Sequence, residues 1–186
     1  MTTIATSPGL SKTASALRQL YFVRFAFALV WAVLLFTTAK EIGPLAAVLL
    51  VLYPLFDAGA AIVDARSSRT SGSPALLYVN IAVSLITAIG VGAAAASGIP
   101  AVLRVWGAWA IVAGAVQLIV GIRRRKLGGQ WPMIISGGLS VLVGGSFLAS
   151  AGADNPTLAN AAGYAIAGGV FFLISALRLG RAAKGN

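Results

Sequence analysis

Five polar side chains interrupt the apolar stretches of the sequence and are its first candidates for chemistry: Arg24, Asp57, Asp64, Asn80 and Gln117. Charged groups inside a membrane span are costly, so they mark either a proton or ion pathway or a pair that joins helices. Asp57 and Asp64 lie at i and i+7, on one face of a helix. We expect Arg24 to pair with Asp57 or Asp64, with Asn80 as a third member, because a nearby guanidinium stabilises a carboxylate in lipid.

The inventory of reactive side chains is too small for most enzymes. The sequence has no cysteine and no histidine, which removes thiol chemistry, disulfides, thiolate metal sites and imidazole bases. The only acids are Glu41, Asp57, Asp64 and Asp154. The pair Gly128-Gly129 indicates a turn and not a phosphate loop, because no Gly-Lys-Ser/Thr follows it. We therefore predict no catalytic residue, no metal site, no cofactor and no enzyme activity.

The elements that position these residues are predicted to be membrane helices. Hydrophobic residues make up 59% of the chain and charged residues 10%, against about 25% charged in soluble domains. An alternative interpretation of the N-terminal segment is a signal or transit peptide, but five later apolar runs favour an uncleaved first helix. The fold class is an all-α integral membrane bundle, with cytoplasmic tails at residues 1–20 and 180–186 and six transmembrane helices at residues 21–39, 45–65, 75–96, 101–122, 131–150 and 158–179.

The basic residues predict the orientation and the partners. Most of the fourteen cations lie near the two termini and in the second and fourth connections, whereas Lys40 and Arg104 lie on the other side. This positive-inside pattern places both termini in the cytoplasm and explains the net charge of +10 without nucleic acid. The partner is the lipid bilayer, and its anionic headgroups are candidates to bind the basic run Arg123, Arg124, Arg125 and Lys126. The oligomeric state is left open.

A weak internal repeat underlies the six predicted helices. At an offset of 56 residues, Arg24 aligns with Asn80 and Ser136, and Ala28 aligns with Ser84 and Ser140. At an offset of about 57 residues, the even-numbered helices align so that Asp57 coincides with Gly114 and Gly169. We interpret the bundle as three repeated helical hairpins.

Small residues predict where the helices pack closely. They recur every four positions, which lets helix backbones approach each other in lipid. The candidates are Ser136, Ser140 and Gly144 in residues 131–150, Ala110 and Gly114 in residues 101–122, and Ala165 and Gly169 in residues 158–179. We expect them to join the second and third hairpins. Trp106, Trp109 and Trp131 lie toward the ends of their spans and are predicted to anchor them at the membrane interface.

Part of the sequence resembles a known family. The resemblance depends on the segment from Gln117 to Trp131, which contains Gly-Ile-Arg-Arg-Arg-Lys-Leu-Gly-Gly-Gln. A glycine-rich segment from Ile135 to Gly145 follows it. This pattern is similar to the HdeD-like acid-resistance membrane proteins, a bacterial six-span family. The resemblance covers roughly Arg18 to Arg181. The family usually has Asp-Gly late in its second helix, whereas here Ala58 separates Asp57 from Gly59.

The resemblance implies a small bacterial inner-membrane protein that acts in envelope or acid-stress tolerance by a non-enzymatic mechanism. It implies no catalytic residue and no cofactor. The alternative is a small transporter or channel for protons or a small solute, in which the five polar residues would line the path.

Overall fold

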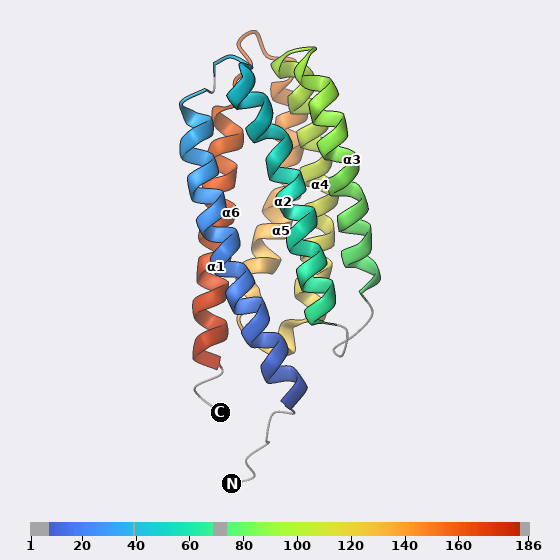
Figure 1. Ribbon diagram of the computed structural model, residues 1–186, viewed down its shortest axis with the longest axis vertical. Helices are drawn as coiled ribbons and strands as arrows, with labels where there is room; N and C mark the ends of the chain where they lie inside the picture. The colour runs from blue at the N-terminus through green and yellow to red at the C-terminus, as the bar shows by residue number, and fades with distance from the viewer. Residues whose placement is uncertain (1–7, 39, 69–73, 183–186) are drawn as a thin grey trace.

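The computed structural model describes residues 8–38, 40–68 and 74–182, so the outer parts of both predicted tails lie outside the described residues. The described residues form six long α-helices and a short 3-10 helix, η1 (Arg125–Leu127) (Figure 1). The long helices are α1 (Pro8–Phe36), α2 (Pro44–Ser67), α3 (Ala75–Ala95), α4 (Ile99–Arg123), α5 (Trp131–Ser150) and α6 (Ala159–Ala182).

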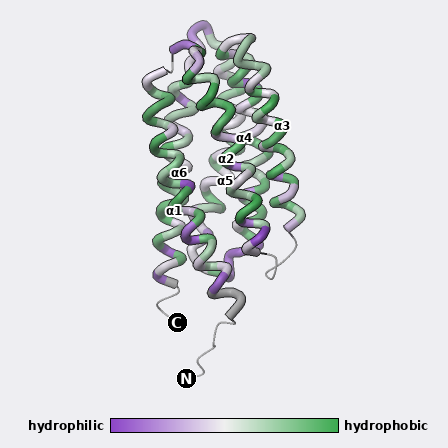
Figure 2. The backbone as a smooth tube through the Cα atoms, in the orientation of Figure 1, coloured by the Kyte–Doolittle hydropathy of each residue, from purple (hydrophilic) through white to green (hydrophobic). Residues whose placement is uncertain are grey.

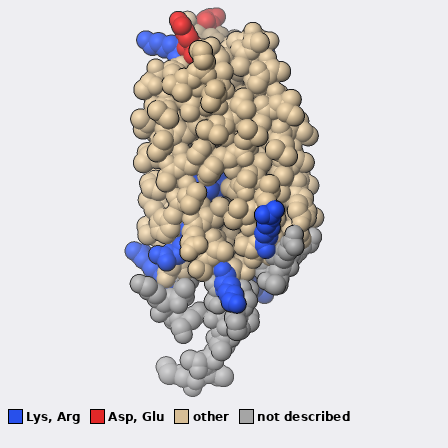
Figure 3. Space-filling model, in the orientation of Figure 1, with Lys and Arg blue, Asp and Glu red and all other residues tan. Residues whose placement is uncertain are grey.

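All six helices are long and apolar enough to cross a membrane, and the chain is therefore a multi-span membrane protein. Hydrophobic residues predominate along most of the length of the bundle (Figure 2). The start of α1 and the end of α6, which adjoin the two termini, lie at the same end of the bundle (Figure 1). On the face drawn in Figure 3, most basic residues gather near that end and the acidic residues at the other.

The first helix begins earlier than the span predicted at residues 21–39. Helix α1 starts at Pro8. Residues 8–20, which precede the predicted span, are rich in Ala, Leu, Lys, Arg and Gln, and these residue types favour helix. Tertiary contacts hold it there: Leu17 is fully buried beside Leu179, and the Thr13 hydroxyl donates to the Ser67 carbonyl over 3.4 Å. The other five helices begin and end close to their predicted spans, with proline in the first turn of α2, α4 and α5.

The helices form a closed ring in which neighbouring hairpins pack together more extensively than the two helices within a hairpin. The most extensive contacts join α2 to α3, α4 to α5, and α6 to α1. Residues at equivalent repeat positions meet at each of these three interfaces. Asp57 contacts Ser84, a Cβ on Gly114 would lie 2.6 Å from the Cβ of Ser140, and one on Gly169 would lie 3.2 Å from the Cβ of Ala28. These contacts fit three copies of one helical pattern.

Helices α4 and α5 approach each other most closely. A Cβ added at Gly144 would lie 2.6 Å from the Gly107 carbonyl oxygen, and one added at Gly137 would lie 2.6 Å from the Leu118 nitrogen. Ser136 and Ser140 are buried on the same helix, and Ala110 is buried on α4. The predicted contact between the second and third hairpins is thus formed by α4 and α5. Gly169 does not join it, because it packs on α1, and Ala165 lies in the main core.

An aromatic cluster fills the bundle toward the end remote from the termini. Trp31 stacks on Trp106 with a centroid separation of 5.5 Å, and Tyr53 and Trp109 lie against them. Trp31 also donates to the Leu49 carbonyl over 2.6 Å. The predicted interfacial role is therefore wrong for Trp106 and Trp109, which are 1% and 5% exposed. Trp131 is 62% exposed, as an anchor would be.

Candidate functional site

A cavity lined by residues of all six helices lies inside the bundle, and we call it the central chamber. Its volume is about 90 Å³, enough for several water molecules, because each needs roughly 10–15 Å³ on this measure. Every helix contributes a side chain to its wall. One polar member from each, in chain order, is Arg24, Asp57, Asn80, Gln117, Ser136 and Tyr164.

Asp57 is the centre of the inner network of hydrogen bonds in the chamber wall. Its Oδ1 pairs with the Arg24 guanidinium from α1. Its Oδ2 accepts hydrogen bonds from Asn80 over 2.7 Å and from Ser84 over 2.8 Å, both on α3. Trp109 on α4 then donates to the Ser84 hydroxyl over 3.0 Å. One carboxylate therefore links four helices, and its charge is both paired and hydrogen-bonded.

Arg24 lies deep in the bundle. It is the central residue of the apolar segment Lys12–Phe36, twelve residues from each end, which is about 18 Å at 1.5 Å per residue. The side chain is directed into the bundle, where it lines the chamber. Its guanidinium carbon lies 4.4 Å from the centroid of the Phe172 ring, a cation–π contact that gains strength away from water. The side chain is 17% exposed and that of Asp57 is 6% exposed.

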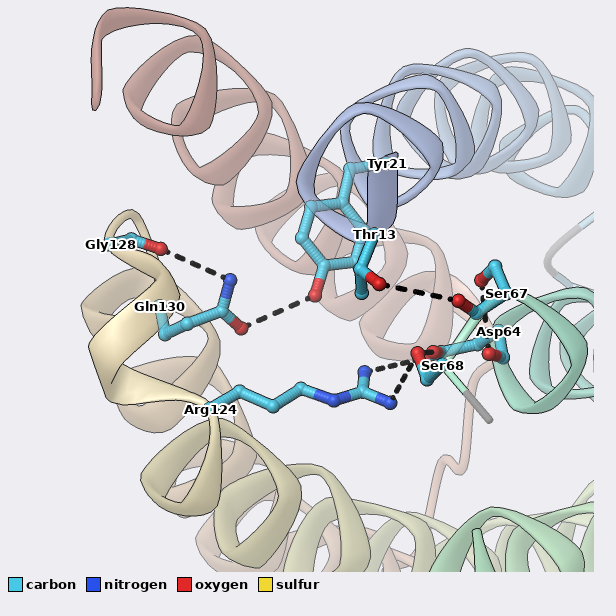
Figure 4. Close-up of polar contacts among 8 residues, drawn as sticks. All are labelled: Thr13, Tyr21, Asp64, Ser67, Ser68, Arg124, Gly128 and Gln130. Atoms are coloured by element: carbon cyan, nitrogen blue, oxygen red, sulfur yellow. Dashed lines mark hydrogen bonds and ion pairs between the residues drawn. The ribbon is translucent and has the colours of Figure 1, made fainter. Parts of the chain in front are cut away.

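A second set of contacts crosses the chamber near the termini, and we call it the Arg124 closure (Figure 4). Arg124 Nη1 donates to Asp64 Oδ2 over 2.8 Å, and its Nη2 donates to the Ser68 hydroxyl over 2.9 Å. Ser68 in turn donates to Asp64 Oδ1 over 2.9 Å. The guanidinium thus joins the end of α4 to the end of α2.

Tyr21 and Gln130 extend the closure toward α1 and α5. The Tyr21 hydroxyl donates to Gln130 Oε1 over 3.5 Å, and Gln130 Nε2 donates to the Gly128 carbonyl over 3.3 Å (Figure 4). Gly128 and Gly129 have φ values of 73° and 64°, a left-handed conformation that favours glycine. This tight turn places Gln130, which is 1% exposed, in the wall of the chamber.

Arg124 stays charged in this position. Burial alone would lower the pKa of its guanidinium, but the hydrogen bond and the charge of Asp64 outweigh that effect and raise the pKa above its ordinary value. The closure is therefore not opened by deprotonation of Arg124 at any pH at which proteins remain folded.

We predict that Arg124→Leu destabilises the protein in detergent by about 1–3 kcal/mol, because it leaves the Asp64 carboxylate without its charged partner. The measurement is the midpoint of thermal unfolding. Arg125→Leu is the matched control, since Arg125 is exposed in the same basic run and should change the midpoint little. Equal midpoints for the two variants would contradict a stabilising closure.

The structure brings together the five polar residues singled out in the sequence, since Arg24, Asp57, Asp64, Asn80 and Gln117 all line the chamber. They do not form a single network. Arg24 pairs with Asp57 and not with Asp64, whereas Gln117 donates to the Met133 carbonyl over 3.2 Å. The basic run also divides: Arg123, Arg125 and Lys126 are exposed, but Arg124 turns inward.

Several lining residues were not predicted from the sequence, notably Arg124, Tyr21, Tyr53, Trp109, Gln130 and Tyr164. A signal for Arg124 was present: Gln117, Gly121 and Arg124 recur at i, i+4 and i+7, which places them on one helix face. All three line the chamber. The aromatic residues carried no comparable signal.

Comparisons with known proteins add no family to this description, because no family model, curated protein or solved structure matches the chain.

Proposed function

We propose that this membrane protein takes up a small polar solute or protons in its central chamber and acts as a small transporter or channel. The observation that supports this most is the chamber itself, to which all six helices contribute. Binding sites of transporters commonly lie near the middle of the bundle, at the interface between repeats. Here the chamber lies between the aromatic cluster and the Arg124 closure, so transport would require one end to open at a time.

A second candidate is a role in envelope or acid-stress tolerance, in the bacterial inner membrane and without enzyme chemistry. It is favoured by the resemblance to the HdeD-like proteins. The stretch that carries the resemblance, Gln117 to Trp131, is also the segment that holds Arg124, the Gly128-Gly129 turn and Gln130. It therefore coincides with the residues that close the chamber. The two proposals are compatible, because a stress role could depend on the solute that the chamber holds.

The orientation with both termini in the cytoplasm is part of the proposal. It is supported by the cations near the end of the bundle that holds the termini. Because the chain has no cysteine, single cysteines can report it. Lys126 and Asn155 are both exposed and lie at opposite ends of α5. In intact cells, we expect an impermeant thiol reagent to label Asn155→Cys but to reach Lys126→Cys only after permeabilisation. The reverse pattern would invert the orientation.

The transport proposal is tested with purified protein in liposomes. Internal pH reports proton movement, and light scattering after an osmotic jump reports uptake of small solutes. We expect at least one flux to exceed that of protein-free liposomes. Ala61 lies in the chamber wall between Asp57 and Asp64 and is 3% exposed. Ala61→Leu should therefore abolish the excess flux, whereas the same change at exposed Ala167 should preserve it. No flux above the protein-free level would reject the proposal.

A further inference from the structure

Arg24 has a buried donor that the protein itself does not satisfy. Among the described residues, Arg24 Nε is buried without a hydrogen-bond partner, although Nη2 is paired with Asp57 and the guanidinium lies over Phe172. Buried N–H groups in folded proteins almost always have a partner, and one without a protein partner points to a bound water or ligand. Arg24 lines the chamber, and because Nε itself is buried, an acceptor atom in the chamber reaches it only when the side chains around it move apart.

Two amide side chains in the chamber wall offer hydrogen-bond acceptors, which complement the Arg24 donor. Asn80 uses its side-chain nitrogen to donate to Asp57, and Gln117 uses its nitrogen to donate to the Met133 carbonyl. Each amide therefore keeps its carbonyl oxygen as an acceptor. A ligand that suits these groups has an oxygen that accepts from Arg24 and N–H or O–H groups that donate to Asn80 or Gln117.

The charges of the wall favour an uncharged ligand. The chamber is lined by two arginines and two aspartates, and they form two ion pairs, Arg24 with Asp57 and Arg124 with Asp64. A charged solute would be left without a counter-charge in a poorly solvated site, at a high cost. A neutral polar solute needs only the hydrogen bonds that the wall offers.

The volume limits the size of the ligand. A cavity of about 150 Å³ accommodates benzene, which has six carbon atoms. By proportion, the chamber of about 90 Å³ holds about four non-hydrogen atoms. We infer that the central chamber binds an uncharged solute of this size with both an acceptor oxygen and donor hydrogens, such as a simple amide, and that Arg24 Nε donates to its oxygen. The inference rests on the proposed function, in that the chamber is the solute site.

Acetamide and acetate provide matched probes, because each has four non-hydrogen atoms and one methyl group, and only acetate is charged at neutral pH. Saturation-transfer difference NMR with the full chain in detergent measures binding through the methyl signal. We expect a several-fold larger signal for acetamide with the wild-type protein than with Ala61→Leu, and no such difference for acetate. Ala167→Leu, which makes the same change on an exposed surface, should behave as wild type.

Each outcome separates this inference from the proposed function. A larger difference for acetate than for acetamide would overturn the neutral ligand, and so would equal acetamide signals for wild type and a folded Ala61→Leu, even if protons cross the liposome membrane. Should Ala61→Leu fail to fold, Asn80→Leu is the second variant, and an unchanged acetamide signal there would also overturn the inference. Binding of acetamide without any flux in liposomes would support the inference and reject transport.

Discussion

Asp57→Leu should destabilise the protein by about 3–5 kcal/mol, the usual cost of removing one partner of a buried ion pair. The reason is that Arg24 would remain charged inside the bundle without its partner carboxylate. Asn80 and Ser84 would also lose their common acceptor. The measurement is thermal unfolding in detergent together with the yield of folded protein.

The double variant Arg24→Leu/Asp57→Leu provides the decisive comparison. It removes both charges, so it should be more stable than Asp57→Leu alone. Its destabilisation should also fall below the sum of the two single changes by an interaction energy on the order of 1–3 kcal/mol. Asp154→Leu is the control for loss of an acid at an exposed position and should have little effect. Strictly additive effects of the two single changes would show that the pair contributes nothing to stability.

Gly144→Leu is expected to have the other large effect. The helix backbones meet here: an added Cβ would lie 2.6 Å from the Gly107 carbonyl oxygen and 2.9 Å from the Ile111 nitrogen. Neither backbone can move without separating α4 from α5. Overpacking usually costs about 1–3 kcal/mol and sometimes more, and a contact with backbone belongs at the upper end.

The neighbouring glycine is the control for that change. A Cβ at Gly145 has no atom within 4 Å, so Gly145→Leu should leave the unfolding midpoint unchanged or raise it slightly, because leucine favours helix more than glycine does. Similar midpoints for the Gly144 and Gly145 variants in detergent would mean that α5 does not pack on α4 through this face.

The membrane fold could be predicted because hydropathy and length alone indicate the spans. The contacts of Asp57 with Arg24 and Asn80 could also be predicted, since a polar residue within an apolar run must find a partner inside the protein. The partner of Asp64 was missed because Arg124 follows directly after a helix, where a basic residue is equally consistent with positive-inside topology. Composition does not distinguish Arg124 from Arg123 or Arg125.

A different reason explains why the sequence could not predict which tryptophans face the interior of the bundle and which are exposed. In a soluble helix, the contrast between polar and apolar faces reveals which side is buried. A helix in lipid has apolar residues on both faces, because lipid and protein core are similarly apolar. Trp106, which is buried, and Trp131, which is exposed, therefore look alike in sequence. What distinguishes them is how α4 and α5 are turned about their own axes, which the contacts of Gly107 and Gly144 fix.

The closure of the ring by α1 and α6 has a consequence for biosynthesis. Helix α1 packs far more extensively on α6 than on α2, yet 182 − 36 = 146 residues separate the end of α1 at Phe36 from the end of α6 at Ala182. At about 5–20 residues per second, the ribosome needs roughly 7–30 s to translate that interval. During this time α1 lacks the surface of α6 that covers it in the complete fold, including the Phe172 ring that contacts Arg24. Translation of the last helix therefore sets the earliest moment at which the protein can complete its fold.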